Sequence, residues 1–168
     1  MRFILFFIFS FCLISCKNTD NGVKISQETF IKSFSIDHFE NGKKLWTLKC
    51  NNAVVDDKKN TIKCFETTVN LFRDKVLTTE MRSRFGYGDL SDNSFYLKNN
   101  VYILSYIEDT SIESDIVYFD FKKNIIHSDL RSRIVKRRDN VEIISKGFKS
   151  NTDISNIKFF NHTTRVLK

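Results

Sequence analysis

An internal repeat of 31 residues constrains this chain more than any other feature, and it covers residues 79–168. One apolar position recurs at this spacing, at Met81, Ile112 and Ile143. A second recurs in the same way, at Phe95, Ile126 and Ile157. A weaker fourth copy precedes them, in which Cys50 corresponds to Met81 and Cys64 corresponds to Phe95. Such a repeat predicts an array in which each unit buries its apolar face against its neighbours.

Each repeat unit has the pattern of two β-strands. Apolar residues alternate with polar ones, as in Phe95 and Leu97, and short clusters of Gly, Asn, Asp and Ser separate the runs. This period-two pattern predicts antiparallel strands and turns. In Thr110–Asp120 three apolar residues also fit helical spacing, but the segment is rich in Ile, Val, Tyr and Phe, which favours a strand.

The first part of the fold follows the same pattern. A strand is expected over 30–39, and Asn41-Gly42 predicts a two-residue hairpin turn because both residues tolerate positive φ. After the turn, Trp46 is expected on the opposite face from Leu45. A long strand over 61–72 is expected to carry three apolar residues on one side, namely Phe65, Val69 and Leu71. The last strand is expected over 156–166.

Residues 1–15 have the pattern of a targeting signal rather than of a folded domain. Arg2 precedes an apolar run that ends in Leu13-Ile14-Ser15-Cys16, which resembles a bacterial lipoprotein signal. We therefore expect a signal peptide over 1–15, acylation of Cys16 with palmitate-type chains, a flexible tether over 16–29 and a folded domain over 30–168. An uncleaved membrane anchor is the alternative, but the apolar run of about 14 residues is shorter than the ~20 that a spanning helix needs.

Composition narrows the classes of function. The formal net charge is +7, which suits acidic partners such as anionic lipid headgroups, although a solvated basic face would give the same count. Proline is absent, which suits long strand ladders. The three histidines are isolated and no motif for a nucleophile, phosphate loop or metal is visible, so no enzyme activity and no cofactor are expected. Nucleic acid is not an expected partner of an exported lipoprotein.

Several short motifs resemble the LptC family, the membrane-anchored periplasmic component of lipopolysaccharide export. Gly42, Trp46 and Ala53 match the family's Gly, aromatic and small positions. Lys146-Gly147-Phe148 partly matches a later turn, and the resemblance covers about 30–166. Many family members carry an uncleaved transmembrane helix where this chain has a lipoprotein signal. The resemblance therefore concerns the periplasmic domain and not a helix inside the transporter.

The resemblance implies an all-β fold, an open, twisted, V-shaped antiparallel β-jellyroll like that of OstA and LptA. It implies a relay that accepts lipopolysaccharide from the membrane subunits of an inner-membrane ABC transporter and passes it to an LptA-like periplasmic bridge protein. The last strand would pair with the bridge protein and the first would face the transporter. Eleven apolar residues could line the trough for the acyl chains: Trp46, Leu48, Phe65, Val69, Met81, Leu97, Val101, Ile103, Ile112, Ile143 and Phe159.

Two alternatives stay open at the level of sequence. Each of these lining residues could simply fill the core of a closed β-sandwich, and the chain would then be a structural or adhesive envelope lipoprotein. Cys50 and Cys64 face each other if their repeat equivalents do, and they would then be either a disulfide or two buried thiols.

Overall fold

The computed structural model describes residues 28–92 and 94–167, and this part of the chain forms ten β-strands and no helix. All strands pair antiparallel in one sheet, which confirms the all-β prediction. The strands are β1 (Glu28–Glu40), β2 (Lys43–Asp56), β3 (Thr61–Arg73), β4 (Val76–Asp89), β5 (Ser94–Ser105), β6 (Thr110–Asp120), β7 (Ile125–Ser128), β8 (Ser132–Lys136), β9 (Val141–Ser150) and β10 (Ile157–Val166). The signal segment, Cys16 and residues 16–27 of the tether lie outside the described residues.

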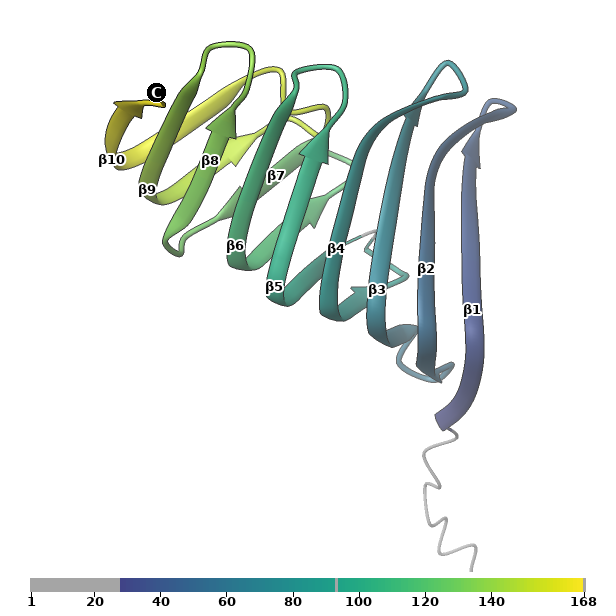
Figure 1. Cartoon of the computed structure of the whole chain (residues 1–168). Helices are drawn as coiled ribbons and strands as arrows, with labels where there is room; N and C mark the ends of the chain where they lie inside the picture. Colours follow the sequence, from purple (N-terminus) through teal and green to yellow (C-terminus); the bar gives the residue numbers. More distant parts are fainter. Residues whose placement is uncertain (1–27, 93, 168) are drawn as a thin grey trace, which may run out of the picture.

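The strands lie in the sheet almost in the order in which they occur in the chain (Figure 1). The pairs run from β1 to β6, and then β7 and β8 both lie between β6 and β9. β7 and β8 are therefore two halves of one strand, interrupted at residues 129–131. β1 and β10 form the two edges of the sheet.

Local sequence explains two of the turns. Asn41 and Gly42 have φ of 50° and 74°, and they form the predicted two-residue turn between β1 and β2. Asp74 and Lys75 also have positive φ, 49° and 70°, between β3 and β4. Two successive positive φ values are the requirement of the hairpin turn whose twist matches antiparallel strands. The strand predicted over Thr110–Asp120 is β6, so the helical alternative is wrong.

A crease runs across the whole sheet and divides it into two leaves. Pairing between neighbouring strands skips one or more residues at the same level of the sheet, and most of the skipped residues are exposed. Five of the residues on this line have positive φ: Ser33, Glu66, Asn99, Asn100 and Asn161. We call residues 34–50, 67–83, 101–114, 132–145 and 162–166 leaf 1. Leaf 2 comprises residues 28–32, 52–65, 85–98, 116–128 and 147–160.

The crease folds the leaves toward each other. On each side of it side chains alternate, but across it the inward residues are three apart, as at Ser83 and Gly86. Apolar residues of both leaves consequently share one buried core. In Figure 1 the strands bend near one end, where the sheet turns behind itself.

The sequence repeat corresponds to a row of paired inward residues in leaf 1. The row crosses seven strands through Leu48, Val69, Met81, Ile103, Ile112, Ile134 and Ile143. The alignment of the weaker fourth copy is wrong by two residues. Leu48, not Cys50, lies in the row of Met81, and Ile62, not Cys64, lies in the row of Phe95.

Two side chains lie on other faces than alternation predicts. Phe65 does not share a face with Val69, because Glu66 adopts a φ of 50° at the crease and shifts the alternation. Phe65 is exposed on the outer face and packs against Phe85. Leu45 lies at a register shift between β1 and β2, and it lines the same cavity as Trp46.

Candidate functional site

The interior between the leaves holds most of the residues predicted to line a trough. Eight of the eleven are 0–6% exposed and form the core: Leu48, Val69, Met81, Leu97, Val101, Ile103, Ile112 and Ile143. Trp46 and Phe159 are half-buried at its margins, and Phe65 lies on the outside. The structure thus brings ten of the eleven to the interior and places Trp46 in the wall of a cavity.

That cavity opens between the leaves near the β1 edge, with a volume of about 620 Å³. We call it the mouth. Its apolar wall includes Leu45, Trp46, Phe72 and Phe121, and its cations are Arg73 and Lys122. Lys44 lies nearby, with Nζ 5.3 Å from the centre of the Phe72 ring. The carboxylates of Glu40 and Asp153 also line it, so the mouth combines apolar rings with charges of both signs.

A stack of four rings joins the leaves at the mouth. Trp46 of leaf 1 lies between His38, at 5.0 Å, and Phe121 of leaf 2, at 5.1 Å between ring centres. Phe121 continues the stack to Phe119, at 6.0 Å. Face-to-face contact of this kind adds to the apolar burial of the rings and holds the leaves together at one point.

The loop over residues 151–156 closes part of the space between the leaves. Ile154 is 2% exposed and belongs to the core. Thr79 Oγ1 donates to the Thr152 carbonyl at 3.2 Å, and Ser105 Oγ donates to the Asp153 carbonyl at 3.0 Å. The loop is thus attached to strands β4 and β5 of leaf 1.

An ion pair between Arg73 of β3 and Asp153 of this loop spans the mouth. Burial alone would raise the pKa of the Asp153 carboxyl, but hydrogen bonds from Ser155 and the Arg73 guanidinium together lower that pKa below its usual range. Ser155 donates through its backbone N–H at 3.1 Å and its hydroxyl at 2.8 Å. Asp153 is therefore charged at neutral pH and joins the loop to leaf 1.

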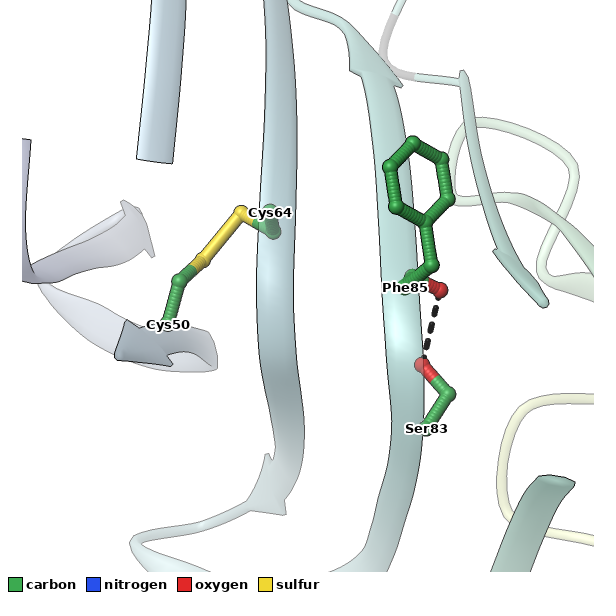
Figure 2. The surroundings of a disulfide bond; sticks show 4 residues. All are labelled: Cys50, Cys64, Ser83 and Phe85. Carbon is green, nitrogen blue, oxygen red and sulfur yellow. Dashed lines mark hydrogen bonds between the residues drawn. A yellow bond between two sulfur atoms is a disulfide. The ribbon is translucent and has the colours of Figure 1, made fainter. Parts of the chain in front are cut away.

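Cys50 and Cys64 form a disulfide across the crease, with Sγ atoms 2.13 Å apart (Figure 2). Cys64 is paired with Ala53, three residues from Cys50, which would place the two Cα atoms about 11 Å apart in a flat sheet. They are 5.5 Å apart because β2 bends at the crease. In the neighbouring strand, Ser83 Oγ donates to the Phe85 carbonyl at 2.9 Å and satisfies the backbone at the same bend.

The edge strand β10 is held by a buried carboxylate on β9. The Glu142 side chain is 1% exposed and pairs with Arg165 of β10 and with Arg133 of β8, the latter at 2.5 Å. Hydrogen bonds from Arg133 and then Arg165 lower the pKa of Glu142. β10 itself is exposed along most of its length, as the last strand of a sheet is expected to be.

The histidines lie apart from one another. Each is in contact with an aromatic ring: His38 with Trp46, His127 with Tyr118 and His162 with Phe159. Among residues 28–92 and 94–167, no group of three or more His, Cys, Asp or Glu side chains is placed to hold a metal ion. The same residues include no helix long and apolar enough to cross a membrane.

No sequence motif marks Phe72, Arg73, Phe121 or Asp153 as site residues. All four lie in or beside turns, which become neighbours only when the leaves fold together. One sequence signal could have located the crease and hence the mouth. It is the place in each unit where inward residues are three apart instead of two, at 83–86, 114–117 and 145–148.

The comparisons with protein-family models and with curated proteins find no match for this chain.

Proposed function

We propose that this protein is a non-enzymatic carrier of lipopolysaccharide, with an open β-jellyroll of the LptC type that relays the lipid across the periplasm. The observation that carries the proposal is the mouth, where apolar rings and cations line one cavity at the entrance to an apolar interior. Acyl chains need an apolar lining, and the phosphates of lipopolysaccharide need cations nearby.

The division of tasks within the site follows from its chemistry. Leu45, Trp46 and Phe121 would contact acyl chains, which would reach the deeper residues only as the leaves move apart. Lys122 would contact a phosphate, since it forms no ion pair with any of the described residues. No covalent step is required, and an ABC transporter would supply the energy.

The two edge strands of the sheet support the proposed transfer of lipopolysaccharide from one protein to the next. β1 and β10 have unpaired backbone groups on their outer sides, which is what β-strand addition requires. In this proposal β10 pairs with the LptA-like bridge protein, and β1 faces the membrane subunits of the transporter. Acylation of Cys16 would hold the domain on the periplasmic side of the inner membrane.

A second candidate function is a structural or adhesive lipoprotein with a closed core. The complete burial of Met81, Ile103 and Ile112 favours it, because no lipid can contact these side chains while the leaves stay together.

Photocrosslinking in cells separates the two candidates. A photoreactive phenylalanine analogue replaces Phe72 or Phe121 in the mouth, and Tyr102 on the outer face of leaf 1 is the control position. Light-dependent adducts with lipopolysaccharide at the mouth and not at Tyr102 are expected. If a folded, membrane-attached protein gives no adduct at either mouth position, the carrier proposal fails and the closed lipoprotein is favoured.

The anchor is tested separately by labelling with a palmitate analogue. Incorporation into the wild-type chain and its loss in Cys16→Ser are expected. Equal labelling of both would contradict acylation at Cys16 and leave the crosslinking result unaffected.

A further inference from the structure

The outer face of leaf 2 carries a row of rings bounded by lysines. Directly paired residues of neighbouring strands point to the same face of a sheet. In this row they are Lys63, Tyr87, Tyr96, Tyr118, His127 and Lys149. Successive ring centres from Tyr87 to His127 are 5.3, 5.9 and 5.1 Å apart. The rings therefore form a continuous strip across four strands.

A second row beside it has the same character. Phe65 and Phe85 are paired and pack edge to face at 5.5 Å, and Phe85 is paired with Lys98. Phe65 is 42% exposed and Tyr118 is 39% exposed, so large rings on this face contact solvent. A monomeric soluble protein rarely leaves contiguous rings in this condition unless they contact something.

Most of the unpaired charges of this face are positive. Its carboxylates include Asp89, which accepts hydrogen bonds from Ser91, and Asp120, which pairs with Lys123 at 2.7 Å. Lys63 pairs with Glu28 at 3.6 Å, whereas three other lysines form no ion pair in the part of the chain that the structure describes, namely Lys98, Lys149 and Lys158. Lys149 and Lys158 are directly paired across β9 and β10, so two like charges are neighbours. This pair is destabilising in isolation, and an anionic partner would relieve the repulsion.

The outer face of leaf 1 is different, because most of its charges form ion pairs. Arg82 pairs with Glu80 at 2.5 Å, and Arg133 pairs with Glu113 at 3.1 Å. Single exposed rings such as Phe39 and Tyr106 also occur in leaf 1, but the continuous strip of rings beside unpaired lysines is a feature of the leaf 2 face.

We propose that the outer face of leaf 2 docks on a lipid bilayer that contains anionic headgroups. Tyrosine rings have an apolar body and a polar tip, which places them at the level of headgroups. Lysines extend their charge toward the anionic surface while their methylene stems cover the rings. A sugar chain is the less suitable occupant, because Tyr87 and Tyr96 cover each other's ring faces, with an angle of 25° between ring planes.

The start of the described chain agrees with this orientation, and this step rests on the proposed acylation of Cys16. β1 enters the sheet at Glu28 in leaf 2, and eleven residues, 17–27, separate it from Cys16. A chain of that length spans at most about 40 Å. An anchored domain would therefore hold leaf 2 close to the membrane surface.

Vesicle sedimentation tests the docking without the anchor and without lipopolysaccharide. Residues 28–167 supply all ten strands and the core, so an unlipidated chain that begins at Lys17 retains the fold. This chain is mixed with vesicles of 30% phosphatidylglycerol in phosphatidylcholine, and with pure phosphatidylcholine vesicles. The double variant Lys149→Glu/Lys158→Glu tests the face, and Tyr118→Ser tests the rings. Lys49→Glu/Lys75→Glu makes the same change of net charge on leaf 1 and its turn.

Binding to the anionic vesicles is expected for the unaltered chain, with a decrease as salt is raised. The leaf 2 double variant is expected to lower the partition coefficient on the order of tenfold or more. Tyr118→Ser should lower it less, and the leaf 1 control should leave it near the unaltered value. Equal binding to both vesicle types, or equal binding by the two double variants, would overturn the proposal. Absence of vesicle binding together with retention on a polysaccharide column would also overturn it and assign the face to glycans. None of these outcomes bears on adducts at Phe72, so the carrier proposal can fail or survive independently.

Discussion

The interiors of the two leaves fill their share of the core in different ways. Leaf 1 places aliphatic side chains of neighbouring strands in one row, as in Met81, Ile103 and Ile112, so neighbours of similar size stand side by side. Leaf 2 places a large ring over glycines. A Cβ atom at Gly88 would lie 2.6 Å from Phe95 Cδ2, and one at Gly86 would lie 2.8 Å from Phe95 Cζ. The two leaves thus fill the core with different residue types, aliphatic side chains in one and a ring over glycines in the other.

The largest loss of stability is expected from a cavity in the aliphatic row of leaf 1. Ile112 is fully buried, so Ile112→Ala should lower the free energy of unfolding by about 2–5 kcal/mol. Ile112→Val should lower it by about 0.5–1.5 kcal/mol. Denaturant unfolding measures both. A small loss in Ile112→Ala would mean that leaf 1 collapses around the gap and that its row is not tightly packed.

The next prediction concerns the disulfide that links the leaves. The disulfide closes a loop with a sequence separation of 14, and its removal in Cys50→Ser/Cys64→Ser should lower stability by ~3 kcal/mol in the chain-entropy model. Mass spectrometry of the non-reduced, mature protein should first find no free thiol at either position. Two free thiols would contradict the disulfide.

A smaller effect is expected where leaf 2 depends on the absence of a side chain. Gly88→Ala should cost about 1–3 kcal/mol, because the new methyl group overlaps the Phe95 ring. Met81→Leu in leaf 1 is the matched control and should cost less than about 1.5 kcal/mol, since volume is nearly conserved.

A second substitution tests whether overlap with the Phe95 ring causes the loss of stability in Gly88→Ala. If the ring is the obstacle, Phe95→Leu should lessen the effect of Gly88→Ala, and the double variant should be more stable than the sum of the single changes predicts. Simple additivity would show that the glycine is needed for a different reason.

The smallest effect concerns the ion pair that joins the loop over 151–156 to leaf 1. Because the pKa of Asp153 is lower in the folded than in the unfolded state, its contribution is present above the unfolded pKa of ~3.9 and is lost as pH falls through the folded pKa. Asp153→Asn should therefore be less stable than wild type at neutral pH, with a difference that shrinks on acidification. A difference that does not change with pH would contradict this role.

The strands were largely predictable because their signals are local. Alternation identified β6, and Asn41-Gly42 identified the first turn. The face of Phe65 was mispredicted because one residue with positive φ, Glu66, reverses the alternation, and glutamate gives no warning of that conformation. The fourth copy was aligned two residues off because the unit that begins in β2 is two residues longer than the later units of 31 residues.

The site was less predictable because it is made by distant turns. Trp46 was expected at the interior and lies there, but its stacking partner Phe121 comes from a turn that alternation describes only as the end of a strand. Burial of Met81 and its neighbours could be predicted from the pattern, whereas the extent to which the leaves close over them depends on contacts such as Arg73 with Asp153.

The strand order described above has a consequence for how a chain of this kind can grow. Since strands join the sheet nearly in chain order, copying one 31-residue unit would add two strands and widen the sheet by about 9.6 Å. β1 and β10 would remain at the ends, and the crease would extend by the same step. A single internal duplication could thus enlarge the interior while both edge strands stay as they were.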